Sequence, residues 1–138
     1  MSQLPTTHSM KSFKRRSDRF SMTKAHGTPV RLKGDIAIQA IGGGLVSAAQ
    51  IEAARRSITR KTNRQGRFWR NLTPNHPVSG KPIDSRMGRG KGAIDYYTVF
   101  VRPGAIIFEL ADLEPAVAIA ALKSAQTKLG IPTKLRQR

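Results

Sequence analysis

The spacing of apolar residues along the chain predicts two helices. The first begins near Ser47 and runs to about Asn63. Ser47 and Gln50 match a capping box, in which both side chains accept hydrogen bonds from unpaired backbone N–H groups at the start of a helix. The second helix begins at Pro115 and ends at Gly130, because proline suits the first helical position and glycine the position after the last. The first helix carries a narrow apolar stripe, formed by Ile51, Ala54 and Ile58.

Shorter stretches alternate with a period of two or are rich in β-branched and aromatic residues, which is typical of strands. Their ranges are 30–41, 67–72, 94–101, 105–110 and 131–135. Residues 102–105 are expected to form a turn, with Pro103 and Gly104 at its centre. Residues 72–82 contain three prolines and are expected to be an irregular connection. Strands and helices interleave, which predicts one compact α+β domain with an antiparallel or mixed sheet and two main helices.

Three side chains in the predicted strands carry their own expectations. Phe68 and Trp69 are expected in the core, although neighbours in a strand point to opposite faces. Glu109 is expected to face solvent or to pair with an arginine.

The charge of the chain indicates a polyanionic partner. The 138 residues, about one domain in length, include 25 Lys and Arg against 8 Asp and Glu, a formal net charge of +17. Such a charge is tolerated when nucleic acid neutralises it. Residues 1–91 hold nineteen of the basic and four of the acidic residues, so binding is expected there. No apolar run is long enough to span a bilayer, and the absence of cysteine excludes disulfides and thiolate metal sites.

Residues 1–24 contain six basic residues, one acid and too few apolar residues to fold alone. Two interpretations stay open, a mitochondrial transit peptide and a basic arm that orders on RNA. We favour an extended arm over residues 1–28, followed by an RNA-binding domain over residues 29–138. The candidate RNA-binding residues of the arm are Lys11, Lys14, Arg15, Arg16 and Arg19.

Basic residues of the first helix and the next strand form a second candidate group. Arg56, Arg60 and Arg64 recur at every fourth position, which predicts that they line one helical face. Glu52 is the one acid nearby, so this face is either merely solvated or neutralised by a bound polyanion, and we favour binding. The candidates in this region are Arg55, Arg56, Arg60, Lys61, Arg64, Arg67 and Arg70.

A glycine-rich basic loop follows at residues 86–92. Its glycines allow the backbone to approach a phosphate or sugar closely, and its cations neutralise the phosphates. The spacing is neither that of a P-loop nor that of a dinucleotide fingerprint. A flexible solvated loop is the alternative, but the basic surroundings favour an RNA-inserting loop. The candidates here are Lys81, Arg86, Met87, Gly88, Arg89, Gly90, Lys91 and Gly92.

Catalytic chemistry finds little support in the sequence. The three histidines are scattered and lack metal-ligand spacing. The carboxylates form no obvious catalytic pair. We therefore expect no enzyme activity, no metal, no cofactor and no small-molecule substrate.

Several segments together resemble the bacterial and organellar L-sixteen family of large-subunit ribosomal proteins. The matching segments lie in order over most of residues 45–134 and comprise residues 50–56, 64–70, 81–82, 86–92, 107–109 and 125–133. The chain departs from the family pattern at Asn75-His76-Pro77 and at Tyr96-Tyr97.

This resemblance implies a hammerhead-type fold and a structural role between the central protuberance and the peptidyl-transferase region of the large subunit. It implies large-subunit rRNA, A-site tRNA and neighbouring ribosomal proteins as partners, and a loop at residues 86–92 that reaches toward the functional centre. Arg86 matches an arginine that is hydroxylated in some bacterial members. The alternative function is a free basic RNA-binding or RNA-chaperone protein. The departures favour the mitochondrial matrix, with the bacterial cytoplasm as the alternative.

Overall fold

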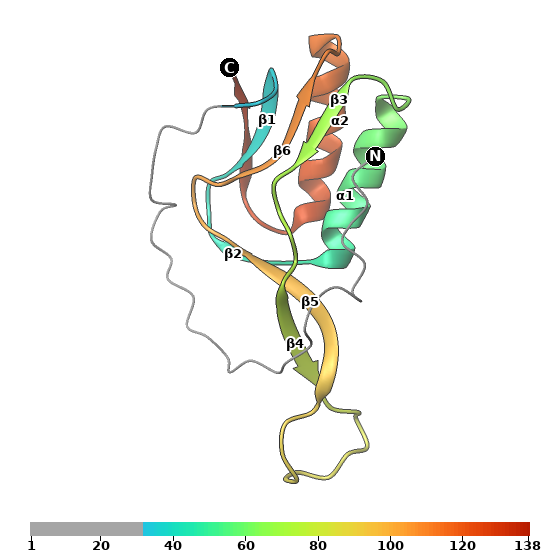
Figure 1. Ribbon diagram of the computed structural model, residues 1–138, viewed down its shortest axis with the longest axis vertical. Coiled ribbons are helices and arrows are strands. Elements are labelled where there is room, and N and C mark those ends of the chain that lie inside the picture. Colours follow the sequence, from blue (N-terminus) through green and yellow to red (C-terminus); the bar gives the residue numbers. More distant parts are fainter. Residues whose placement is uncertain (1–31) are drawn as a thin grey trace.

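The computed structural model describes residues 32–138, so the predicted arm and its boundary lie outside the described residues. Two helices, α1 and α2, pack against each other and against one face of a four-stranded antiparallel sheet (Figure 1). The helices are α1 (Ala48–Lys61) and α2 (Pro115–Leu129). The strands of this sheet, in spatial order, are β3 (Arg67–Arg70), β6 (Ile106–Ala111), β1 (Ile36–Ala40) and β7 (Thr133–Gln137).

A second, three-stranded antiparallel sheet extends from this body. Its strands, in spatial order, are β2 (Gly44–Ser47), β5 (Ala93–Val101) and β4 (His76–Gly80). Strands β4 and β5 form a hairpin that projects away from the helices, and its connecting loop lies at the far end of the molecule (Figure 1). The fold therefore places residues 81–92 far from the helical layer.

Both helices form where local signals predict them. The Ser47 hydroxyl accepts a hydrogen bond from the Gln50 N–H at 3.2 Å, and the Gln50 side chain accepts one from the Ser47 N–H at 2.9 Å. Pro115 occupies the start of α2, and Gly130 ends it in the left-handed conformation at φ 67°. The capping box and the proline-to-glycine limits are thereby confirmed. Helix α1 ends at Lys61, slightly before the predicted end.

The core lies between the helices and the four-stranded sheet. The predicted stripe of α1 is buried, as are the apolar side chains of α2 that face it. The largest fully buried side chains are Phe108, Ile38, Ile51, Ile58, Ile107, Leu110, Leu122 and Leu129. The α+β class with two main helices is thus confirmed.

The predicted antiparallel pairing is confirmed, but the number of sheets differs. The strands belong to two antiparallel sheets rather than one. The connection expected to be irregular contains β4, because β4 is an edge strand and an edge tolerates Pro77, which has no N–H to donate. Strand β2 begins at Gly44, the last of three consecutive glycines, and has only four residues and too little alternation to detect. The first strand was predicted over residues 30–41. Within the described residues, β1 covers only Ile36–Ala40.

The turn and the remaining strands agree with expectation. The Ala105 N–H donates to the Arg102 carbonyl at 3.1 Å, and Gly104 has φ 91°. A positive φ at this position is what a type II turn requires.

Phe68 packs against the core, with its ring 5.5 Å from that of Phe108. Trp69 lies outside the core cluster and is half-buried, so its assignment to the core was wrong: it points to the opposite face of β3.

Glu109 is buried rather than exposed, which overturns its prediction. Only 2% of its surface is accessible. Its carboxylate accepts hydrogen bonds from the backbone N–H groups of Lys33 and Gly34, the latter at 3.0 Å, and from the Asn71 side-chain amide at 2.6 Å. Phe108 and Leu110 point toward the helices, so Glu109 between them points to the other face of the sheet. The sheet is covered there by residues 32–35.

Candidate nucleic-acid interface

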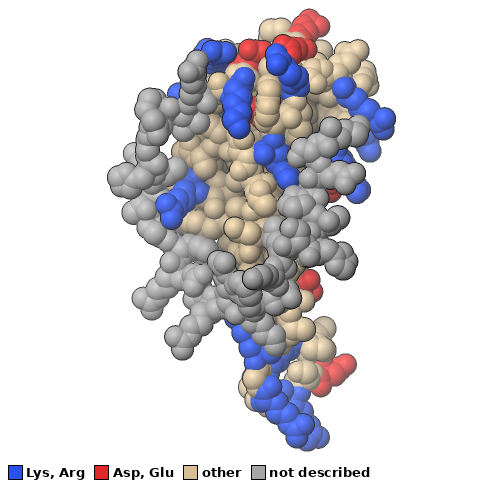
Figure 2. Space-filling view, viewed as in Figure 1, with Lys and Arg blue, Asp and Glu red and all other residues tan. Residues whose placement is uncertain are grey.

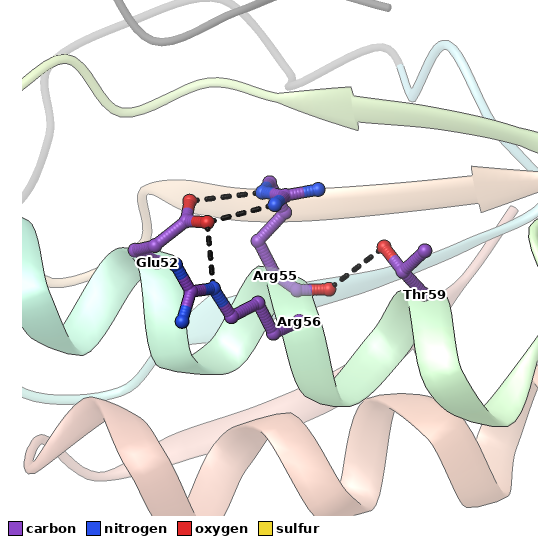
Figure 3. Close-up of polar contacts among 4 residues, drawn as sticks. All are labelled: Glu52, Arg55, Arg56 and Thr59. Carbon is purple, nitrogen blue, oxygen red and sulfur yellow. Dashed lines mark hydrogen bonds and ion pairs between the residues drawn. The ribbon is translucent and has the colours of Figure 1, made fainter.

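In the first turns of α1, two arginines form ion pairs with the same glutamate. Glu52 accepts two hydrogen bonds from Arg55, at 2.7 and 2.9 Å, and one from Arg56 at 3.0 Å (Figure 3). The hydrogen bonds with Arg55, followed by those with Arg56, lower the pKa of Glu52 from 4.5 to about 2. The carboxylate therefore stays ionised near neutral pH. It fixes both guanidinium groups and leaves this trio with a single net positive charge.

The remaining cations of α1 point outward. Arg60 and Lys61 lie in its last turn and are exposed. Neither has an acidic partner within residues 32–138. Cations are favourable at the negative end of the helix dipole, so their position also has a structural use.

Arg64 does not continue the line of Arg56 and Arg60, so its predicted place on the helical face was wrong. The helix ends at Lys61, and Asn63 and Arg64 then adopt left-handed backbone angles, with φ 49° and 63°. Gly66 follows with φ 74°, and a Cβ atom there would lie 2.5 Å from the Leu113 side chain. This tight reversal carries Arg64 away from the outer face of the helix and to the start of β3.

Between the second half of α1 and β3 lies a cleft of about 310 Å³. Ile58 and Phe68 give it an apolar surface, and arginines contribute from three segments of the chain. Its main lining residues are Arg55, Ile58, Thr62, Arg64, Phe68 and Arg70. The cleft thus combines apolar contact with several guanidinium donors in one small space.

Arg70, unlike Arg64, is partly shielded from solvent. It is half-buried, and burial lowers the pKa of its guanidinium below the ordinary value, an effect that Glu52 opposes and Arg55 reinforces. The charged form persists, because an arginine pKa starts far above neutral pH. Arg70 has no hydrogen-bond acceptor within residues 32–138.

Arg67 lies on the opposite face of β3, because alternate strand residues point to opposite sides. It is hydrogen-bonded to Asp112, and its guanidinium lies 5.8 Å from the centre of the Trp69 ring. The ion pair raises the pKa of Arg67 and lowers that of Asp112. The structure therefore separates Arg67 from Arg70, two residues that the sequence placed in one group.

The hairpin loop forms a second basic surface. Residues 81–91 are all exposed, and the fully exposed Met87 and Ile83 stand among the cations. The Lys81 ammonium group donates a hydrogen bond to the Gly88 carbonyl at 2.7 Å, which links the start of the loop to its tip. Blue side chains gather at this end of the hairpin in Figure 2, with acidic ones on its flank.

The glycines of the loop differ in what they require. Gly88 and Gly90 have φ 95° and 84°, but no atom within 4 Å would meet an added Cβ. Gly92 lies so close to the Gly80 carbonyl oxygen that a Cβ would approach it to 2.1 Å. Gly92 therefore closes the hairpin, whereas Gly88 and Gly90 shape an open tip that faces solvent.

The predicted residues thus fall into separate places. The cleft and the outer face of α1 belong to the body, the loop lies at the far end of the hairpin (Figure 1), and the arm candidates lie outside the described residues. The prediction missed the cleft residues Thr59, Thr62 and Gln65. The spacing of Arg55, Thr59 and Thr62, four and three residues apart, was a signal for one helical face.

Other classes of site find no support in the described part of the chain. Residues 32–138 contain no group of three His, Cys, Asp or Glu residues that is able to hold a metal ion. No helix in this range is both long and apolar enough to cross a membrane.

Sequence comparison with known proteins points to one family. A family model described as ribosomal protein L16p/L10e matches residues 7–136. The large ribosomal subunit protein uL16 of Sulfurovum sp. is 46% identical over 102 residues, 74% of this chain and 72% of that protein. The protein of the same name from Pelagibacter ubique is 43% identical over 119 residues, 83% of this chain and 88% of the relative. That of Rickettsia canadensis is 42% identical over 117 residues, 85% and 86% of the two chains.

Proposed function

The chain belongs to the L16p/L10e family of ribosomal proteins, and from this premise we propose that it binds large-subunit rRNA with its body and approaches A-site tRNA with the tip of its hairpin. Its relatives are proteins of the large ribosomal subunit, so the chain is a structural ribosomal protein and not an enzyme. Neighbouring proteins of the subunit are further partners.

The observation that carries the proposal is the separation of two basic surfaces. The arginines of α1 and the cleft lie on a packed body, where they suit a stable attachment to rRNA. The hairpin holds Arg86, Arg89 and Lys91 away from that body on an exposed loop. A protein attached by its body and extended by a hairpin reaches a site that the body does not occupy, which suits contact with tRNA.

We expect rRNA binding to depend steeply on salt. If about six phosphates are neutralised, the slope of log K against log salt is near −4 to −5. The measurement is a titration of purified large-subunit rRNA with the full chain at several salt concentrations. A nearly flat dependence contradicts the proposal. Sedimentation separates it from a free RNA chaperone, because a ribosomal protein stays with the large subunit in a moderate-salt gradient and a chaperone is recovered at the top.

The second expected result concerns the loop. Gly90→Val forces a β-branched residue to φ 84°, which costs about 1–3 kcal/mol of local strain, and Lys91→Gln removes one charge. Both variants should fold, because the loop adds nothing to the core. Both should impair tRNA binding in reconstituted subunits, Gly90→Val more severely if backbone shape dominates.

Matched controls exist for both loop variants. Gly104→Val imposes similar strain at φ 91°, also with no neighbour within 4 Å, but in the turn between β5 and β6. Lys123→Gln removes an exposed charge from α2. If loop and control variants bind A-site tRNA and form peptide bonds equally well, residues 86–92 are only a solvated connector.

We propose the mitochondrial matrix as the compartment, on the departures from the family pattern at Tyr96 and Asn75. The relatives named above are bacterial, which makes the bacterial cytoplasm the alternative. An intact-mass measurement on purified subunits tests this. Loss of residues 1–24 would reveal a transit peptide, whereas the full mass would support a retained arm. An added oxygen would reveal hydroxylation, which we place at Arg86.

A further inference from the structure

We propose that the cleft between α1 and β3 binds a single RNA nucleotide, with its phosphate on Arg70 and Arg64 and its base or ribose against Phe68. The inference rests on the proposed function and deepens it, because it assigns one part of the body to a specific nucleotide rather than to the phosphate backbone in general.

The size of the cleft favours one nucleotide. Its volume of about 310 Å³ is at the lower end of the range for small-molecule sites, about 300–1,000 Å³. A duplex does not fit such a space, but an unpaired nucleotide does. Unpaired nucleotides are also the part of RNA that proteins read most specifically.

Arg70 supplies the strongest argument, because it is a half-buried cation that lacks an acceptor within residues 32–138. A guanidinium group offers five N–H donors, and removing it from water is costly unless acceptors replace the water. Glu52 attracts it but accepts no hydrogen bond from it, and the Glu52 oxygens accept from Arg55 and Arg56 instead. An acceptor from outside residues 32–138 would satisfy Arg70, and a phosphate meets the geometry of a guanidinium group.

The other lining groups complement a nucleotide rather than a bare anion. The Thr59 and Thr62 hydroxyls donate to the carbonyls of Arg55 and Thr59, at 3.0 and 3.5 Å. Their free lone pairs are left to accept hydrogen bonds, which suits a ribose hydroxyl or a base N–H. The Phe68 ring is held by Phe108 and offers a flat surface to a base.

This combination favours RNA over an acidic peptide. A carboxylate side chain satisfies Arg70, but it uses neither the aromatic surface nor the threonine acceptors. A nucleotide uses all three features. Arg60 and Lys61 lie in the last turn of α1, next in sequence to the lining residues Thr59 and Thr62, and they suit phosphates that flank the bound nucleotide.

The test is nucleotide-resolution footprinting of purified large-subunit rRNA with the full chain. Arg70→Gln removes the charge, Arg70→Lys keeps the charge but not the planar fork, and Arg102→Gln removes an exposed arginine from the β5–β6 turn as the control. We expect Arg70→Gln to weaken binding about 10- to 100-fold and to expose one nucleotide that the wild type protects. Arg70→Lys should leave that nucleotide exposed. Arg102→Gln should leave it protected.

Several results would overturn the inference. Equal footprints for Arg70→Gln and Arg102→Gln would show that Arg70 binds no nucleotide, and full recovery in Arg70→Lys or an evenly spread loss would show that only its charge matters. Unchanged rRNA binding with poor incorporation into subunits would point to an acidic protein partner instead. If the wild type itself protects no rRNA, the proposed function falls and the inference falls with it.

Discussion

Replacing Ile51 by aspartate is expected to unfold the protein. The Ile51 side chain is completely buried between α1 and the rest of the core. Losing such a side chain costs about 2–5 kcal/mol, and a buried unpaired carboxylate adds several kcal/mol more. The sum is close to the whole stability of a typical domain, about 5–15 kcal/mol. Ile51 is a better target than Ile58, because Ile58 lines the cleft, where a carboxylate would find Arg55 and Arg70.

The control for this variant is Ala53→Asp, which introduces the same side chain on an exposed position of the same helix. It should change the free energy of unfolding by less than about 1 kcal/mol. The measurement is far-UV circular dichroism during urea unfolding. We expect a cooperative transition for Ala53→Asp and none for Ile51→Asp. Equal transitions for the two variants would mean that α1 does not pack through the Ile51–Ile58 stripe.

The helices were predictable because their limits depend on local chemistry. A capping box needs only Ser47 and Gln50, and Pro115 and Gly130 act on the residues next to them. The division of the strands into two sheets was not predictable, because strand pairing depends on residues far apart in the sequence. Strand β4 in particular carries Pro77, a residue that argues against a strand unless its place at a sheet edge is already known.

The candidate site shows the same limit. Arg55, Arg56 and Arg60 were assigned correctly to α1, but Arg64 was placed by extending the helical spacing past the true helix end. The left-handed angles at Asn63 and Arg64 are rare outside glycine. Asparagine tolerates them better than most residues, but nothing in the pattern signals one at Arg64. Arg67 and Arg70 were grouped together, although strand alternation alone places them on opposite faces. That Arg70 makes no hydrogen bond within residues 32–138 becomes clear only from the structure, in which Glu52 accepts hydrogen bonds from Arg55 and Arg56 instead.

Replacing Glu109 is expected to give the second large loss of stability. Glu109→Leu leaves the N–H groups of Lys33 and Gly34 and the amide of Asn71 without their acceptor. The Gly34 donor is buried and the other two are only partly buried. A donor that loses its acceptor costs about 1–3 kcal/mol when buried and less where water replaces the acceptor, so we expect a total loss of about 3–5 kcal/mol. Glu109→Gln keeps the shape but turns one acceptor into a donor, and should lose about 1–3 kcal/mol.

Glu114→Gln is the matched control, because Glu114 is exposed and makes no side-chain hydrogen bond at the start of α2. It should change the free energy of unfolding by less than about 0.5 kcal/mol. Urea unfolding measures all three variants, and an unchanged m-value shows that stability alone has shifted. If Glu109→Gln is as stable as Glu114→Gln, the carboxylate is not a structural acceptor.

Hydrogen exchange shows whether the loss arises at this contact. The Glu109 carboxylate holds residues 33 and 34 on the sheet face opposite the helices, where the chain leads directly from residues 1–31 into β1. Gly34 is needed at this place, because a Cβ would lie 2.5 Å from the Leu110 carbonyl oxygen. We therefore expect Glu109→Gln to speed exchange first at the amides of Lys33 and Gly34. Uniformly faster exchange throughout the sheet would instead mean that Glu109 supports the core and not the entry of the chain into it.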